Sequence, residues 1–253
     1  MNADPKTQRR YREIAGKLQE EIAQGKYGIG ERMPSERDLA EAFSVSRPTI
    51  REALIMLEII GAVEVRVGSG VYVTEQGPSV PMGGQKFDDD VGPFELLQAR
   101  QVIESEVAAF AALQTTKADI ARMREALEQE KKELESGKVE YSHDEIFHQL
   151  IADATQNTVL SEAVRDLWAR RNHSAMWQQL HKRIFINEYR QQWLGDHQAI
   201  LQALRARSPE AARSAMWTHL QHVRETLLQV SDVEDPAFDG YLFDQPASTV
   251  ISA

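Results

Sequence analysis

Residues 30–73 decide the fold of the N-terminal part; they read GERMPSERDLAEAFSVSRPTIREALIMLEIIGAVEVRVGSGVYV. Ser35 precedes an apolar-periodic run, and Asp38 follows it at the three-residue spacing of a capping box, which marks the start of a helix. Ser46 begins a second such run, which stops at Gly61. The stretch therefore predicts two helices joined by a very short link.

A β-hairpin is expected after these two helices, and a further helix before them. Valines alternate with other residues at 63, 65 and 67 and again at 71 and 73, with the turn-forming Gly68-Ser69-Gly70 between them. Residues 7–24 carry apolar side chains at helical spacing, and Gly25 ends that run. Two helices joined by a short turn and followed by a two-stranded wing form a winged helix-turn-helix.

The winged helix-turn-helix places a small set of residues where DNA would lie. Its second helix enters the major groove with its N-terminal residues, where Arg binds guanine O6 and N7 and Thr contacts a thymine methyl or a phosphate. Glycines at the wing tip let the main chain approach the adjacent groove closely. The candidate DNA-binding residues are Arg37, Arg47, Thr49, Arg51, Gly68, Ser69 and Gly70. The alternative is a small helical domain whose arginines are only solvated.

The composition excludes several classes of protein. The 253 residues include no cysteine, which excludes a disulfide scaffold, a thiolate zinc finger and an iron–sulfur cluster. The longest apolar run, Val107–Leu113, is far shorter than the ~18 residues of a membrane span, and no secretory signal is visible at the N-terminus. The formal net charge is −10, but residues 1–76 carry 11 Lys and Arg against 12 Asp and Glu. We therefore expect a cytoplasmic protein whose first part can present a local basic face.

The chain divides in residues 75–92, a segment rich in Gly, Pro and Asp that predicts a linker. After it, every apolar pattern is helical, at 93–114, 116–136, 139–155, 158–174, 177–187, 189–206 and 208–230. We expect a mainly α fold, in which a winged helix-turn-helix precedes an all-α bundle of six or seven helices. The expected domains are a DNA-binding domain at 1–76, a linker at 77–92, an all-α domain at 93–230 and a tail at 231–253.

Several histidines of the predicted bundle point to a metal site. Helical phase places His197 and His219 within apolar stripes of their helices. Asp144 and His148 are four residues apart and share one side of a helix, although phase alone does not choose between His143 and His148. Imidazole and carboxylate suit Zn²⁺ and other first-row ions, and bundles build metal sites between facing helices. The alternative is that each histidine is an ordinary core or surface residue.

The stretch at residues 30–73 resembles, with almost no departure, the DNA-binding domain of GntR-type bacterial transcription regulators. That resemblance implies that Arg37, Arg47, Thr49 and Arg51, together with the wing at residues 68–70, contact DNA.

The second part of the chain resembles the FCD ligand-binding domain of the FadR subfamily, on the run DEIFHQLIADATQN at residues 144–157. The resemblance implies a divalent metal held by Asp144, His148, His197 and His219, and it thereby selects His148 over His143. Zn²⁺ is the expected ion, with Ni²⁺ and Mn²⁺ as alternatives. Asn157 lies in the matching run and is a candidate effector residue, although it could equally cap the next helix.

Arg100 is the second candidate effector residue. Leu96 and Leu97 put its helix into the core, and a charged Arg there needs an anionic partner. That partner is either Glu104, four residues further along the same helix, or a carboxylate effector that bridges Arg100 and the metal. The family resemblance implies an effector-contacting Arg in this segment and so favours the second reading.

A narrower resemblance extends over nearly the whole chain. The strings GPFELLQARQ, LWARRNHSAMWQQLH and WLGDHQAIL are similar to those of hexuronate regulators of the UxuR/ExuR type. This implies a repressor of hexuronate catabolism that a sugar acid such as fructuronate, glucuronate, galacturonate or tagaturonate releases from DNA. We expect a homodimer on a palindromic operator, because a two-fold protein matches a two-fold site.

Three other functions remain open at this stage. The effector could be another small carboxylate, such as lactate or gluconate. The metal could be purely structural, without an effector. The chain could also be a metalloenzyme, although it contains no HExxH, GxSxG or P-loop string, and three His with one Asp already fill a tetrahedral zinc site.

Overall fold

The computed structural model describes residues 9–66, 69–79, 90–136, 142–181 and 187–231. Contacts divide the chain into two compact units, of which the first is Met1–Asp89 with Leu228–Ala253 and the second is Asp90–Leu227. The predicted tail at 231–253 lies outside the described residues except for its first residue, as do residues 80–89 of the predicted linker. The prediction of a winged helix-turn-helix followed by an all-α bundle is confirmed.

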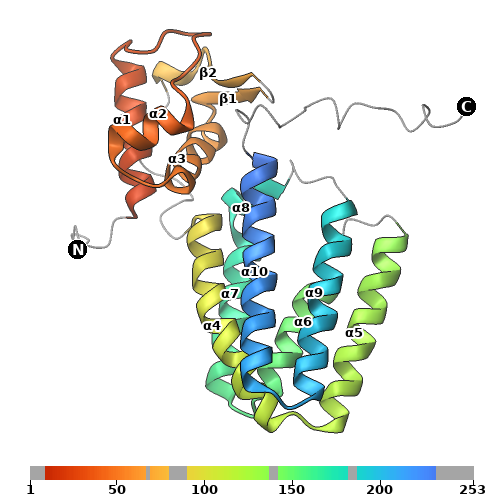
Figure 1. Cartoon of the computed structure of the whole chain (residues 1–253). Coiled ribbons are helices and arrows are strands. Elements are labelled where there is room, and N and C mark those ends of the chain that lie inside the picture. Colours follow the sequence, from red (N-terminus) through yellow and green to blue (C-terminus); the bar gives the residue numbers. More distant parts are fainter. Residues whose placement is uncertain (1–8, 67–68, 80–89, 137–141, 182–186, 232–253) are drawn as a thin grey trace, which may run out of the picture. The chain divides into compact units, whose positions relative to one another are not determined.

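The described part of Met1–Asp89 contains three α-helices and a hairpin (Figure 1), namely α1 (Arg10–Ala23), α2 (Glu36–Phe43), α3 (Arg47–Ile59), β1 (Val63–Arg66) and β2 (Gly70–Val73), followed by the short 3-10 helix η2 (Gly77–Ser79). Ser35 caps α2 through the backbone N–H of Asp38, and Ser46 caps α3 in the same way. Ser44 adopts the left-handed conformation at φ 53°, which ends α2 and turns the chain directly into α3. The two helices are therefore joined by the short turn that the sequence predicts.

The core of this unit lies between α1 and α3, which pack along their apolar stripes. Their fully buried side chains are Ile14, Leu18, Ile22, Ile50 and Leu57. The hairpin pairs antiparallel from Val63 opposite Val73 to Arg66 opposite Gly70. Gly70 has φ 116°, a conformation that other residues rarely adopt.

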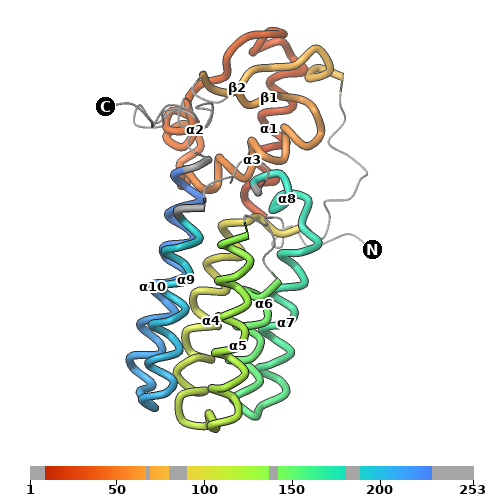
Figure 2. The backbone as a smooth tube through the Cα atoms, turned by 90° about the vertical axis from the view of Figure 1, so that its right-hand side faces the viewer, coloured from red at the N-terminus to blue at the C-terminus, as the bar shows by residue number. Residues whose placement is uncertain are grey.

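The second unit is a helical bundle (Figure 2), and its described part contains α4 (Pro93–Gln114), α5 (Lys117–Glu135), α6 (Ser142–Asp153), α7 (Thr158–His173), α8 (Ala175–His181), α9 (Asn187–Arg205) and α10 (Pro209–Ser231). Helix α4 packs against α6, α7 and α9, while α5 packs against α6 and α9. Fully buried alanines on α4, such as Ala108 and Ala112, let its neighbours approach closely. No helix among the described residues is long and apolar enough to cross a membrane.

Two helix starts of the bundle are fixed by side chains. The Thr116 hydroxyl accepts from the N–H of Asp119, and the Asp119 carboxylate accepts from the N–H of Thr116, which together form a complete capping box at α5. Asn157 caps α7, because its side-chain oxygen accepts from the N–H groups of Val159 and Leu160. These contacts fix where α5 and α7 enter the bundle.

Candidate metal centre and nucleic-acid interface

The first turns of α2 and α3 carry the residues expected to contact DNA. Arg37 and Arg47 are exposed, and a terminal nitrogen of Arg47 lies 3.9 Å from the carboxylate of Glu36. Thr49 shares a hydrogen bond of 2.8 Å with the hydroxyl of the N-cap residue Ser46. Both side chains of α3 therefore stand at its N-terminal end, the end that reads bases in this motif.

Arg51 lies one turn further along α3 and has a different environment. It is 3% exposed, and its Nε donates to both carboxylate oxygens of Glu36 at 2.8 and 3.0 Å. This ion pair joins α3 to α2. A base contact by Arg51 therefore stays a prediction, and it requires the pair with Glu36 to open.

The wing tip is described only in part. Ser69 is exposed, and its hydroxyl shares a hydrogen bond of 2.7 Å with the Tyr72 hydroxyl. Gly70 begins β2. Gly68 lies outside the described residues, so its predicted DNA contact remains a prediction.

The four residues predicted to hold a metal lie together in the bundle. Asp144 and His148 come from α6, His197 from α9 and His219 from α10. One ligand atom of each lies within 4.8 Å of the others. The His197 Nε2 is 3.4 Å from that of His148 and 3.2 Å from that of His219, and the Asp144 Oδ1 is 3.5 Å from both His148 and His197. Three imidazoles and a carboxylate thus converge on one point.

A second layer of carboxylates bonds the opposite edge of two of the three imidazoles. Glu104 pairs with the Nδ1 of His148, and Glu130 lies 2.9 Å from the Nδ1 of His197. A carboxylate at Nδ1 places the proton there, so that the lone pair of Nε2 points to the common centre. The sequence analysis missed Glu130, although it lies three and four residues after the buried Leu127 and Ala126 and so shares their face of α5.

His219 has a looser second layer than the other two histidines. Its Nδ1 is buried, lies 3.6 Å from Asp196 and has no hydrogen-bond partner among the described residues. The Asp196 carboxylate instead accepts from the Nδ1 of His222 at 2.9 Å. His222 is therefore a neighbour of the cluster through Asp196 and is not one of the converging groups.

The pKa values of three groups in and beside the cluster are lowered, for different physical reasons. Burial alone would raise the pKa of Glu104, but Arg100 and His148 together lower it to about 2. Burial would also raise the pKa of Asp144, but the neighbouring histidines outweigh that effect and lower it. Burial holds the pKa of His219 well below its usual value, and the neighbouring His197 and His148 lower it further. Asp144 and Glu104 are thus anionic and His219 is neutral at pH 7.

This donor set fits a divalent cation. Three nearly fully buried imidazole nitrogens and one carboxylate oxygen match the ligands that Zn²⁺ takes in proteins, and second-layer carboxylates at Nδ1 are the usual support of such histidines. The His/Asp cluster can therefore bind a metal. The structure also separates the two candidates that helical phase leaves open, because His143 bonds Glu133 at 2.5 Å instead of joining the cluster.

Arg100 lies beside the cluster on α4, buried at 3% exposure. Its Nε donates to Glu104 at 2.6 Å, and its guanidinium lies over the Trp168 ring at 4.0 Å. Glu104, which the sequence offers as one of two possible anionic partners of Arg100, is thus paired with it. The terminal nitrogens of Arg100 have no hydrogen-bond partner among the described residues, and neither has the buried Nε1 of Trp168. These are donors that an oxygen-rich ligand would satisfy.

Two other residues bear on an effector site. Arg171, on α7, lies over the rings of both Trp168 and Trp177 and adds positive charge near Asp144. Asn157 is exposed and its side-chain oxygen is used in capping α7. The cap accounts for the side-chain oxygen of Asn157 without an effector. A contact between Asn157 and an effector therefore stays a prediction.

Comparisons with known proteins identify both parts of the chain. Residues 10–73 match the family described as bacterial regulatory proteins, gntR family, and residues 95–222 match the FCD domain. The Uxu operon regulator of Haemophilus influenzae is 49% identical over 93% of this chain and 88% of its own length. The Uxu operon transcriptional regulator of Escherichia coli is 47% identical over 96% of both chains. The Exu regulon transcriptional regulator of the same species is 42% identical over 93% of this chain and 91% of its own.

Proposed function

Since the chain belongs to the GntR family of bacterial regulatory proteins, with an FCD domain behind its DNA-binding domain, we propose that it represses genes of hexuronate catabolism and leaves its operator when a hexuronate binds. It is a transcription regulator and not an enzyme. Its similarity to regulators of the uxu operon and the exu regulon supports the hexuronate class. The observation that carries the proposal is the convergence of three histidines and an aspartate beside a buried arginine.

DNA recognition in this proposal starts from the N-terminal end of α3. Arg47 and Thr49 read base edges, Arg37 of α2 holds the backbone, and the wing at residues 69–70 approaches the adjacent groove. Arg51 joins them when DNA phosphate or a base replaces Glu36 as its partner. The carboxylate of Glu36, close to both Arg47 and Arg51, meanwhile holds these guanidiniums at the reading end of the helix.

The metal in this proposal is Zn²⁺, held by Asp144, His148, His197 and His219. When bound, the ion supplies a Lewis-acidic centre that attracts the carboxylate of a sugar acid. Glu104 and Glu130 keep the imidazoles of His148 and His197 in the tautomer that presents Nε2. The protein thereby fixes the donors before the ion arrives.

The effector carboxylate in this proposal lies between the metal and Arg100. The guanidinium of Arg100 uses one nitrogen on Glu104 and keeps its terminal nitrogens for a second anion. The orphaned Nε1–H of Trp168 donates to an oxygen of the same ligand, and Arg171 supplies a second positive charge beside that ring. A buried arginine and an unpaired indole N–H are costly without such a ligand, which favours one that carries both charge and several oxygens.

We also propose that the protein is a homodimer on a palindromic operator. Several large apolar side chains on α4 and α10 are between 41% and 57% exposed, namely Val102, Phe110, Leu113 and Trp217. Glu106 on α4 and Arg213 on α10 form an ion pair with contacts of 2.7 and 3.0 Å on the same two helices. An apolar face of this kind suits burial against its own copy about a two-fold axis.

The test is a titration of an operator complex, using an operator selected from random duplexes, with fructuronate, glucuronate, galacturonate, tagaturonate, lactate and gluconate. We expect at least one hexuronate to release the zinc-loaded protein and none to release metal-free protein. Release by lactate or gluconate alone would assign the site to another carboxylate. Equal release from the metal-free protein would remove the metal from the effector site.

A further inference from the structure

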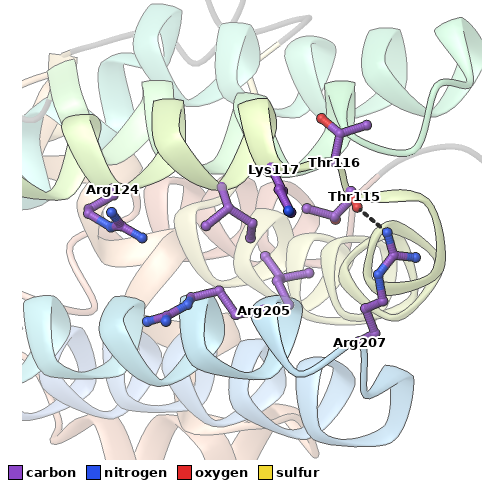
Figure 3. A pocket seen from close by; sticks show the side chains of 8 residues that line it. Thr115, Thr116, Lys117, Arg124, Arg205 and Arg207 are labelled. Atoms are coloured by element: carbon purple, nitrogen blue, oxygen red, sulfur yellow. Dashed lines mark hydrogen bonds between the residues drawn. The ribbon is translucent and has the colours of Figure 1, made fainter.

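A pocket lies in the bundle, where the α4–α5 turn meets the C-terminal end of α9 (Figure 3). Its volume is about 470 Å³, within the range of roughly 300–1,000 Å³ that small-molecule sites occupy. Four of its eight lining residues are cationic and none is acidic; the eight are Thr115, Thr116, Lys117, Ile120, Arg124, Leu204, Arg205 and Arg207. None of them belongs to the His/Asp cluster or to the residues beside it.

Three of the four cations are not neutralised by any described acid. Lys117, Arg124 and Arg205 form no ion pair within the described part of the chain. The neighbouring Arg122, one turn from the same start of α5, does pair with Asp119, and Arg213 of α10 pairs with Glu106. Residues 77–253 carry 18 Lys and Arg against 27 Asp and Glu, so a pocket with cations alone departs from its surroundings.

A favourable position relative to the helix dipole accounts for only one of these three cations. Arg205 ends α9, where a positive charge is favourable. Lys117 is the first residue of α5, at the end of the helix that already carries partial positive charge, while Arg124 lies two turns into the helix, where the helix dipole has little effect. Asp119, the acid of that first turn, is used by Thr116 and Arg122. The four cations are exposed, and the pocket therefore presents a positive potential that no acid of its lining offsets.

The fourth cation holds the wall of the pocket in place. Arg207 follows α9 in the left-handed conformation, at φ 53°. Its guanidinium donates to the carbonyl of Thr115 at 2.8 Å (Figure 3) and to that of Leu113 at 3.1 Å. It thus ties the turn after α9 to the turn before α5, so that Lys117 and Arg124 stand on one side and Arg205 on the other. The cation-bearing ends of α5 and α9 are therefore held at a fixed distance from each other.

We propose that this pocket is a second ligand site, for a compact anion that carries two or more phosphate or carboxylate groups. Guanidinium and ammonium groups on facing helices bind such groups through charge-assisted hydrogen bonds, and Arg does so in bidentate fashion. The ligand would offset the repulsion among Lys117, Arg124 and Arg205. Helices α5 and α9 also carry Glu130 and His197, and Arg205 is eight residues after His197, about 12 Å along the helix, so the two sites share two rigid elements.

The experiment is calorimetry on the full chain after removal of metal, so that the His/Asp cluster cannot bind the probe through an ion. The probes are inorganic pyrophosphate and citrate, at 0.15 M salt. We expect at least one of them to bind the wild-type protein, and the double variant Arg124→Gln/Arg205→Gln to bind it at least about tenfold more weakly. Arg165→Gln, which removes an exposed charge from α7 outside the pocket, is the control and should bind like the wild type.

The choice of probe distinguishes a phosphate ligand from a polycarboxylate ligand. Pyrophosphate binding alone identifies a phosphate ligand, and citrate binding alone identifies a polycarboxylate. Because the metal has been removed, a loss of affinity in Arg124→Gln/Arg205→Gln assigns the probe to this pocket and not to an ion at the His/Asp cluster. Circular dichroism and thermal melts show that the double variant is folded, and Lys117→Gln provides a second, independent loss of affinity. Absence of binding by the wild type, or equal binding by the double variant, would overturn the proposal.

Discussion

His219 is the residue whose environment most clearly separates a metal ligand from a neighbour. Its Nε2 converges with that of His197, whereas the half-exposed His222, three residues later, bonds Asp196. We expect His219→Ala to lose most of its bound metal, because one of four donors is removed. His222→Ala should retain it. Elemental analysis of both purified variants checks this, and retention by His219→Ala with loss by His222→Ala would reverse the assignment.

The carboxylate at Nδ1 of His197 should matter almost as much as a ligand. Glu130→Gln removes the charge that fixes the His197 tautomer, and we expect metal affinity to fall by about 10–100-fold. Glu133→Gln is the matched control on the same helix, because Glu133 bonds His143 away from the cluster. Competition with a chromophoric chelator measures both. Equal affinities for the two variants would mean that Glu130 does not tune the site.

Individual residues differ in how far the sequence specifies them. His197 and His219 are identified by helical phase as inward-pointing, because each lies within a stripe of apolar neighbours, and the structure buries both. His148 and His143 share similar phase, and only the tertiary partners Glu104 and Glu133 separate them. The pairing of Arg51 with Glu36 joins two different helices, so no pattern within either helix predicts it.

At the scale of elements, the two arginines of α3 should respond differently to truncation. Arg47→Ala removes a side chain that is 46% exposed, so we expect about 1–3 kcal/mol less specific DNA binding with an unchanged Tm. Arg51→Ala should also lower the free energy of unfolding by about 1–3 kcal/mol, because it leaves the buried Glu36 carboxylate without its α3 partner. Thermal melts and gel shifts on both variants separate the two effects. An unchanged Tm for Arg51→Ala would show that the ion pair does not hold α2 against α3.

The capping box of α5 should make part of the stability depend on pH. Burial would raise the pKa of Asp119, but hydrogen bonds from Thr116 and Arg122 outweigh it and lower the pKa. A carboxylate with a lowered pKa stabilises the fold above its unfolded value of about 4 and loses that contribution as pH falls further. We expect Asp119→Asn to cost about 0.5–2 kcal/mol at pH 7 and clearly less at pH 3. Denaturant unfolding at both pH values measures it, and an equal cost at the two would exclude the charge as the cause.

Helix ends were more predictable where a side chain caps them. Ser35, Ser46 and Asn157 cap α2, α3 and α7, and the structure starts these helices at the next residue in each case. The short helix expected at 177–187 instead spans Ala175–His181, and residues 182–186 lie outside the described part. Ser174 caps this helix too, because its hydroxyl accepts from the N–H of Trp177 at 3.0 Å. The sequence interpretation extends the preceding helix through residue 174 and so does not use that signal.

At the scale of the whole molecule, the sequence indicates which helices exist but not which of them touch. The cationic pocket combines residues 115–124 with residues 204–207, because α5 packs against α9. Within either segment alone, the cations have the pattern of ordinary solvated charges. The sequence therefore does not predict the pocket. The His/Asp cluster was predictable in advance because a family resemblance supplied the tertiary arrangement that helical phase lacks.

The coupling that we propose between DNA and effector belongs to the whole chain, and any such coupling must be reciprocal. If a hexuronate weakens operator binding by some factor, operator DNA must weaken hexuronate binding by the same factor. Trp168→Phe tests this without removing a charge, because it deletes the unpaired Nε1–H while it keeps a ring beneath Arg100. We expect about a tenfold lower hexuronate affinity, metal content like that of the wild type, and release that is complete but needs proportionally more hexuronate. Calorimetry with and without operator, and anisotropy with and without hexuronate, give the two factors. Unequal factors would show that release is not simple linkage, and tighter operator binding with hexuronate would make the effector a co-repressor.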